Sequence, residues 1–147
     1  MDIQKIAFGS PLYDLSKRLR EQVLRLPLGL VLSAQDTEGE ENQIHIAAIA
    51  PDGSVTGTII LKPASPSLYE IRGVAVAVTL QGKGLGQKLV SFAEHTARQE
   101  GVQRIEMAAR ITAQSFYEKL GYRIYGEPFI KSTIPHIKME KLIAFGT

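Results

Sequence analysis

The chain has 147 residues, 44% hydrophobic and 22% charged, with a formal net charge of +2; this is typical of a single globular domain over residues 1–147 and gives no indication of nucleic-acid binding. The absence of cysteine excludes disulfides, thiolate nucleophiles and cysteine-ligated zinc. Since the chain has neither a secretory signal nor a run long enough to span a membrane, we expect a cytoplasmic protein that binds no membrane.

The first half of the chain predicts a strand, a helix and a hairpin. A short strand over 3–8 precedes Ser10-Pro11, an N-cap followed by a first-turn proline, and apolar residues at helical spacing extend a helix to about Leu24. The acidic segment 36–42 predicts an exposed loop, although its charge could also face an amine substrate. Strands over 44–50 and 55–62 flank the turn residues Pro51-Asp52-Gly53, so we expect an antiparallel hairpin.

The second half of the chain mixes strands with helices. After a loop between Pro63 and Pro66, a long strand over 68–78 becomes apolar on both faces, as a central strand does. An amphipathic helix follows over 85–98 and a short helix over 113–120, each stopped by a glycine. Further strands are expected at 104–109, 122–129 and 136–142. This order predicts an α/β (α+β) fold, with a mixed sheet and helices on both faces.

The segment Gln81-Gly82-Lys83-Gly84-Leu85-Gly86 joins a strand to a helix and predicts a phosphate site. Glycines let a ligand approach the backbone closely, and free N–H groups at a helix start bind phosphates. The segment does not have the spacing of a nucleoside-triphosphate loop. It also fails the dinucleotide pattern G-x-G-x-x-G, because the sixth position of a pattern that starts at Gly82 is Gln87. It does match Q/R-x-x-G-x-G/A, through Gln81, Gly84 and Gly86.

Together with a second motif, this segment resembles the GCN5-related N-acetyltransferase (GNAT) superfamily. The second motif is Ala113-Gln114-Ser115-Phe116-Tyr117-Glu118-Lys119-Leu120-Gly121-Tyr122, which is similar to A-x-x-F-Y-x-K-x-G-F/Y. The segment Ile134-Pro135-His136-Ile137-Lys138-Met139 is similar to the last strand of small bacterial members, so the resemblance covers about residues 44–142. It implies a GNAT fold, with a mostly antiparallel sheet of six to seven strands, splayed between strands four and five, and about four helices on both faces.

The resemblance implies acetyl-CoA (coenzyme A) as the acyl donor and no metal; the three histidines also lack the spacing of metal ligands. In the family, the glycine turn holds the pyrophosphate and strand four binds the pantetheine arm through its backbone. Lys83 and Lys88 either add charge to that site or are solvated. Arg110 replaces the Asn of many relatives, which leaves its cofactor contact open. The implied cofactor-binding residues are Val74, Ala75, Val76, Gln81, Gly82, Lys83, Gly84, Leu85, Gly86, Gln87, Arg110 and Ser115.

The reaction implied is transfer of an acyl group, acetyl above all, to a primary amine by direct attack in a ternary complex. Tyr117 matches the family tyrosine that donates a proton to the departing thiolate; the alternative is a core tyrosine. Glu70 is the candidate general base, but it shares a strand face with Arg72, so an ion pair is an equal alternative. A backbone N–H near Val76 would stabilise the oxyanion. His45 and His136 are interpreted as structural.

The alternative function is a non-catalytic acyl-CoA-binding sensor. Tyr117 and an open acceptor cleft are the features that distinguish the acyltransferase from this sensor. The expected partner is a small-molecule or peptide amine. Homodimer formation through the last strands is suggested by analogy with the family alone.

Overall fold

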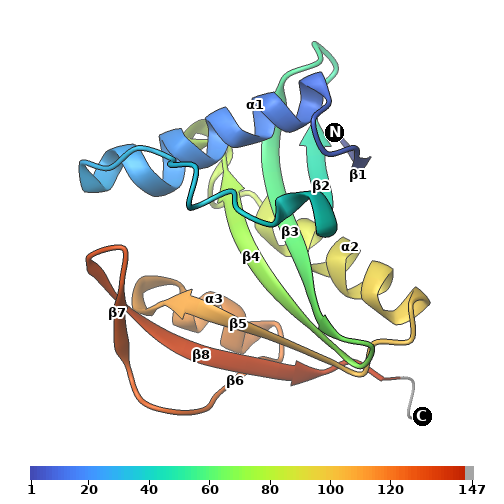
Figure 1. The fold of residues 1–147 in the computed structure, drawn as a ribbon, viewed down its shortest axis with the longest axis vertical. Coiled ribbons are helices and arrows are strands. Elements are labelled where there is room, and N and C mark those ends of the chain that lie inside the picture. Colours follow the sequence, from blue (N-terminus) through green and yellow to red (C-terminus); the bar gives the residue numbers. More distant parts are fainter. Residues whose placement is uncertain (145–147) are drawn as a thin grey trace.

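The computed structural model describes residues 1–144, in which eight strands form one mixed sheet (Figure 1). Their order is β1-β2-β3-β4-β5-β8-β6, with β7 paired to β8. Within these residues, β4 and β5 are the one parallel pair. The expected mixed, mostly antiparallel sheet is confirmed, with eight strands instead of six to seven. The strands are β1 (Asp2–Ile6), β2 (Ile44–Ile49), β3 (Val55–Ser65), β4 (Leu68–Val76), β5 (Arg104–Arg110), β6 (Arg123–Ile124), β7 (Phe129–Lys131) and β8 (Ile134–Leu142).

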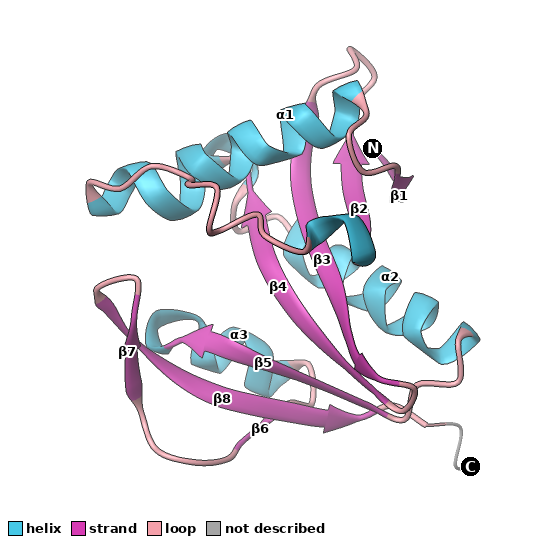
Figure 2. Cartoon of the chain, in the orientation of Figure 1, coloured by secondary structure: helices cyan, strands magenta, loops and turns pink. Residues whose placement is uncertain are grey.

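Helices cover both faces of the sheet, as expected (Figure 2). On one face, α1 (Pro11–Arg20) continues into the π-helix η1 (Glu21–Arg25) and the 3₁₀ turn η2 (Leu26–Leu28). On the other face lie α2 (Leu85–Gln99) and α3 (Gln114–Lys119). The described residues therefore hold three α-helices, instead of about four. The remaining helical segments are the short 3₁₀ turns η3 (Glu40–Asn42), η4 (Val78–Leu80) and η5 (Ile111–Ala113).

Local sequence signals account for the ends of the helices. Ser10 Oγ accepts the backbone N–H of Tyr13 at 3.2 Å and Pro11 lies in the first turn, as predicted. Gly29 follows η2 at φ 74° and Gly121 follows α3 at φ 94°, the left-handed conformation that terminates helices.

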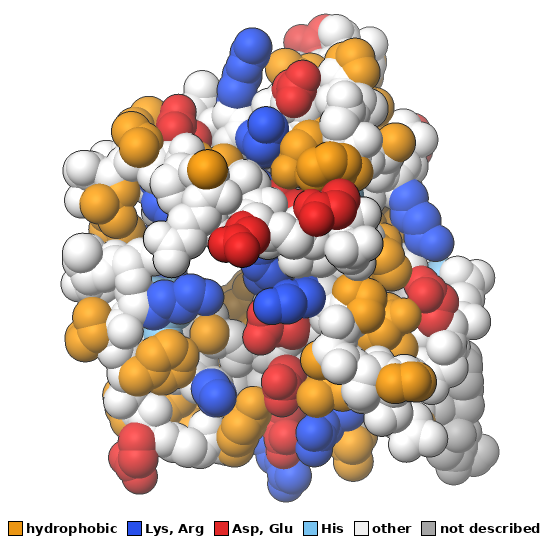
Figure 3. Space-filling view, viewed as in Figure 1, with side chains coloured by type: hydrophobic (Ala, Val, Ile, Leu, Met, Phe, Trp, Pro, Cys, Tyr) orange, Lys and Arg blue, Asp and Glu red, His pale blue; other side chains and the backbone are white. Residues whose placement is uncertain are grey.

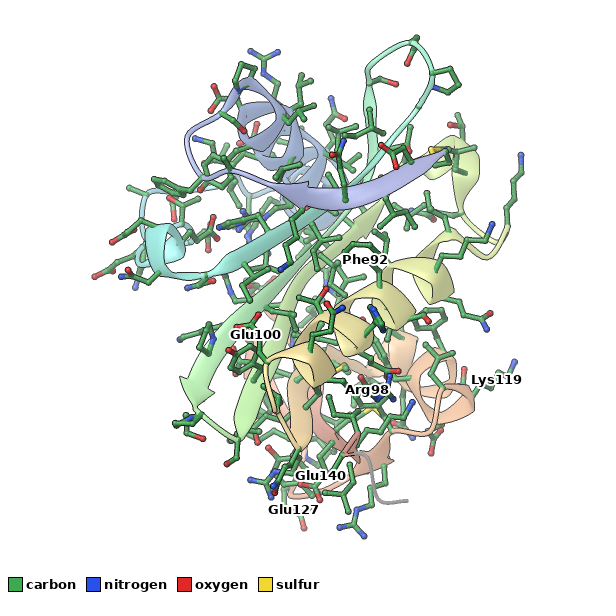
Figure 4. All side chains as sticks on the ribbon, turned by 90° about the vertical axis from the view of Figure 1, so that its right-hand side faces the viewer. Phe92, Arg98, Glu100, Lys119, Glu127 and Glu140 are labelled. Carbon is green, nitrogen blue, oxygen red and sulfur yellow. The ribbon has the colours of Figure 1, made fainter. Side chains whose placement is uncertain are left out.

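The predicted amphipathic helix is α2, and it buries its apolar stripe against the sheet. Leu85, Leu89, Ala93 and Ala97 are buried in one cluster with residues of β3, β4, β5 and β8. Figure 4 shows α2 lying across the sheet with Arg98 near its C-terminal end. Arg98 Nε donates to the carbonyl of Ile143 at 2.9 Å, which ties this helix to the end of β8.

Three local expectations are wrong. Residues 122–129 form the two-residue β6 and then an irregular segment that ends at Phe129, the first residue of β7, because Gly126 (φ 81°) and Pro128 interrupt the strand. Pro63 belongs to β3, where it pairs with Tyr69 beside a β-bulge that tolerates proline. The segment 36–42 is not uniformly exposed, because Glu40 is fully buried.

The sheet splays between β4 and β5, as the resemblance implied. The two strands pair only over Leu68–Glu70 and Arg104–Glu106, and then diverge (Figure 1). A β-bulge sharpens the divergence, because Gly73 and Val74 together oppose Ile59 of β3, and Gly73 adopts φ 62°. The carboxyl-terminal halves of β4 and β5 therefore border an open gap.

Candidate functional site

A pocket opens where β4 and β5 diverge, closed on its other sides by η1, α3 and the β7–β8 turn. Figure 3 shows a hollow between the two halves of the molecule, with Lys and Arg side chains on its rim. The pocket brings together the predicted residues Glu70, Val74, Arg110 and Tyr117. These residues come from three elements, so the splay is what assembles them.

The free edge of β4 faces this gap. Ala77 donates its backbone N–H to the Thr56 carbonyl of β3 at 2.8 Å. Alternation along the strand therefore turns the backbone of Ala75 toward β3, and that of Val74 and Val76 toward β5. Since β5 no longer pairs there, this edge can bind an extended ligand as it would bind a neighbouring strand.

The glycine turn leaves the first N–H groups of α2 without a cap. Gly82 (φ 78°) and Gly84 (φ 86°) adopt left-handed conformations, and the N-cap Gly84 provides no side-chain hydrogen bond. An added Cβ at either glycine would meet no atom within 4 Å, so the space beside the turn is open. Gln81 Nε2 donates to the Val76 carbonyl at 3.0 Å, which joins the turn to the β4 edge. Free N–H groups and the helix dipole make this turn a good phosphate cradle.

The two sequence motifs contact one another in space. A Cβ added at Gly86 would lie 3.3 Å from Cζ of Phe116, so this glycine lets α2 pack closely against α3. Around the cradle, the predicted residues Lys83 and Gln87 are exposed while Leu85 is buried. The predicted Ser115 is exposed on α3.

Tyr117 lies at the pocket with its ring held by aromatic neighbours. It is 6% exposed, and its ring packs edge-on against Phe116 and Tyr122, with centroids 5.0 and 5.9 Å away. Its hydroxyl donates no hydrogen bond to another described residue, and burial alone raises the pKa of Tyr117 to about 12. The phenol is therefore protonated at neutral pH and available to donate.

Glu70 lines the same pocket without an ion-pair partner among residues 1–144. The pair with Arg72 considered from the sequence is not formed, because Arg72 Nη1 donates to Glu40 Oε2 at 2.6 Å. A half-buried carboxylate facing a pocket can accept a proton from an amine or hold its ammonium form.

Glu40, which lies behind the pocket lining, is a buried residue that sequence reasoning missed. Its carboxylate accepts two hydrogen bonds from Arg20, at 2.9 and 2.6 Å, one from Tyr13 at 2.7 Å and one from Arg72. Burial alone would raise the pKa of Glu40, but the hydrogen bonds from Arg20, Arg72 and Tyr13 outweigh it and lower the pKa to about 2. The network fastens the segment after η2 onto α1 and β4, beside the pocket.

Arg110 is directed away from the glycine turn. Its Nη2 donates to the Leu24 carbonyl of η1 at 2.6 Å. The preceding Ala109 packs in the core that α2 covers, so alternation places Arg110 on the opposite face of β5. Its contact with the cofactor stays a prediction, whereas the structure shows that it lines the pocket beside η1.

Two further features concern metals and membranes. No group of three or more His, Asp or Glu side chains within the described part of the chain is arranged to hold a metal ion. Among residues 1–144, no helix combines the length and the apolar character that crossing a membrane requires.

Comparisons with known proteins agree with the geometry. Residues 31–143 match the family described as the acetyltransferase (GNAT) domain. The uncharacterized N-acetyltransferase YitI of Bacillus subtilis is 28% identical over 132 residues, which cover 85% of this chain and 88% of YitI. The crystal structure of a Lactobacillus plantarum protein matches with a TM-score of 0.84 and 25% identity, covering 97% of this chain and 99% of that one. An aminoglycoside 6′-N-acetyltransferase complexed with coenzyme A matches in fold with a TM-score of 0.76 and 21% identity, covering 97% of each chain.

Proposed function

Since the chain belongs to the GNAT acetyltransferase family, we propose that it transfers an acetyl group from acetyl-CoA to a primary amine by direct attack in a ternary complex. When bound, acetyl-CoA supplies the acetyl group as a thioester. The observation that carries the proposal is the continuous path from the glycine turn, along the β4 edge, to Tyr117. Gln81 reaches Val76 at one end of this path, and Val74 and Tyr117 line one pocket at the other.

The residues of this path have the chemistry that coenzyme A requires. The free N–H groups of the turn Gln81–Gly86 and the first turn of α2 would hold the pyrophosphate. The backbone of Val74 and Val76 would hold the pantetheine arm, since amide groups of an open strand edge recognise another amide chain. Ala75, Gln87 and Ser115 complete the proposed cofactor contacts. Arg110 is left out of this set, because it donates to the Leu24 carbonyl and is directed away from the glycine turn.

Tyr117 and Glu70 would handle the protons. The acceptor amine must lose a proton to become a nucleophile, and Glu70 would accept it directly or through water. Its place on the pocket lining supports this role. Tyr117 keeps its proton at neutral pH and would give it to the leaving thiolate.

A catalytic tyrosine separates this proposal from a non-catalytic acyl-CoA sensor. We expect Tyr117→Phe to lower kcat by about 10²- to 10⁴-fold, as loss of a general acid does, with little change in the affinity for acetyl-CoA. The matched control is Tyr125→Phe, because the Tyr125 hydroxyl donates to Glu106 at 2.8 Å and does not line the pocket.

The assay measures release of the coenzyme A thiol from acetyl-CoA with a panel of amines, alongside calorimetric binding of acetyl-CoA. Binding without thiol release for any amine would support the sensor, and absence of binding would exclude both functions. An unchanged kcat in Tyr117→Phe would remove the tyrosine from the mechanism.

A further inference from the structure

The pocket carries more positive than negative charge. Five cationic side chains line it, and Glu70 is the one carboxylate on its lining. Behind the lining, Glu40 pairs with Arg20 and Arg72, and Asp36 pairs with Arg25. Five positive charges against three negative ones leave a surplus of two. The lining cations are Arg20, Arg25, Arg72, Arg110 and Lys131.

Two guanidinium groups converge on one carbonyl oxygen in this pocket. Arg110 Nη2 and Arg25 Nη1 donate to the Leu24 carbonyl, at 2.6 and 3.3 Å. Asp36 neutralises Arg25, with an Nη2–Oδ1 distance of 3.1 Å. Arg110 and Lys131 have no carboxylate partner within residues 1–144. The dipole of one carbonyl cannot balance a full charge. The cluster of Arg25, Arg110 and Lys131 therefore carries more positive charge than its neighbours neutralise.

Burial and the nearby positive charges lower the pKa of two groups at the pocket, Arg110 and His136. Burial lowers the pKa of Arg110, and the charge of Arg25 lowers it further. Burial also lowers the pKa of His136, and the charges of Lys131, Arg110 and Arg25 act in the same direction. Arg25 and Arg110 are half-buried, and Lys131 is exposed at the pocket. Cations that repel one another are stabilised when an anion binds among them.

The turn that carries Lys131 adds a second, independent observation. Ser132 and Thr133 link β7 to β8 with φ angles of 51° and 69°. Hairpin turns of this kind favour Asn and Gly, and a β-branched residue at positive φ is a genuine outlier. Such backbone strain persists where the surrounding structure enforces the conformation, and it is concentrated at functional sites. Here the strained turn carries Lys131 and Ser132, which line the pocket.

We propose that the acceptor is an amine that also carries an anionic group, and that this group, a carboxylate or a phosphate, binds among Arg25, Arg110 and Lys131. The inference rests on the proposed transfer to an amine. The amine end lies toward Glu70, and the anionic end lies toward the β7–β8 turn. Arginine pairs with carboxylates and phosphates through parallel hydrogen bonds. A diamine is disfavoured because its second cation meets the surplus positive charge.

The test uses four compounds that share one alkyl chain and one terminal amine. The other end of the chain is a carboxylate, a carboxamide, a phosphate monoester or a second amine. With saturating acetyl-CoA, kcat/KM should favour an anionic compound over the carboxamide by about 10- to 100-fold, and the diamine should react slowest. The better of the two anions identifies the group that the site takes.

A variant and a binding measurement complete the design. Lys131→Met should lower the ratio of kcat/KM for the anionic compound to that for the carboxamide by about tenfold. Lys5→Met, at an exposed lysine of β1, should leave this ratio unchanged. Calorimetry on the protein loaded with coenzyme A then compares the affinities of the N-acetylated carboxylate, the N-acetylated phosphate monoester and the N-acetylated carboxamide, which requires no turnover.

The outcomes separate the anion site from the transferase activity. If the carboxamide or the diamine reacts as fast as the anionic amines, the anion site is wrong and the transferase proposal stands. If no compound is acetylated but either anionic product still binds more tightly than the carboxamide, and Lys131→Met removes that difference, the anion site stands and the transferase proposal fails. Equal affinities of all three products overturn the anion site in either case.

Discussion

Replacement of Glu40 by glutamine tests the buried network beside the pocket. Glu40→Gln keeps the shape of the side chain but removes the charge that balances Arg20, which is 3% exposed, and Arg72. Breaking a buried pair in this way costs about 3–5 kcal/mol, because an uncompensated charge stays in the interior. For a domain of this size, that loss lowers the thermal midpoint by about 10 °C.

The pH dependence of this effect makes the test sharper. The folded-state pKa of Glu40, about 2, lies below its ordinary value of 4.5. Its contribution to stability is therefore complete above about pH 4.5 and is lost as the pH falls toward 2. Wild type and Glu40→Gln should differ most near neutral pH and converge in acid.

Thermal or urea unfolding between about pH 2 and pH 7 measures both quantities. The matched control is Glu41→Gln, an exposed neighbour whose replacement should shift the midpoint by no more than about 2 °C. If Glu40→Gln unfolds like this control at neutral pH, or if its deficit persists unchanged in acid, the argument for a buried ionic tie is refuted.

The bulge, the strained turn and the proton donor give three further predictions. Gly73→Ala should reduce the free energy of unfolding by about 2 kcal/mol, since its Cβ would lie 3.0 Å from Ile60 Cδ1 at φ 62°; an unchanged denaturation midpoint would contradict this. Thr133→Gly should raise the free energy of unfolding by about 1 kcal/mol in urea titrations, because glycine tolerates φ 69°, and a decrease would remove the strain argument. Because the pKa of Tyr117 is about 12, transfer rates should show no decline from tyrosine ionisation below about pH 10; a decline near pH 9 that Tyr117→Phe abolishes would count against burial as the dominant influence.

Local signals in the sequence were enough to predict most elements of the fold. Ser10-Pro11 and Gly121 act through their own backbone and nearest neighbours, so their effect is readable without a structure. The segment 122–129 differs from the expected strand, because its apolar residues suggest a strand while the positive φ of Gly126 interrupts it. The register shift at Gly73 depends on how β3 and β4 pair, which residue order alone does not reveal.

The candidate site divides in the same way. The glycine turn and Tyr117 belong to contiguous motifs, so the donor path could be predicted from the chain. The burial of Glu40 could not be predicted, because an acidic residue after a glycine in a polar segment is expected to be exposed. Its partners Arg20 and Arg72 are also distant in sequence. The convergence of Arg25, Arg110 and Lys131 likewise exists only after three separate elements meet.

The position of β8 inside the sheet constrains when the protein can fold during synthesis. β5 meets β4 over three residues but pairs with β8 along its whole length, from Arg104–Leu142 to Arg110–His136. The half of the sheet that presents Arg110 to the pocket therefore waits for residues 134–142 to leave the ribosome. Until then β5 has an unpaired edge, which is prone to pairing with another chain. The β1–β4 half can pair much earlier, so the pocket between the halves is among the last features of the molecule to form.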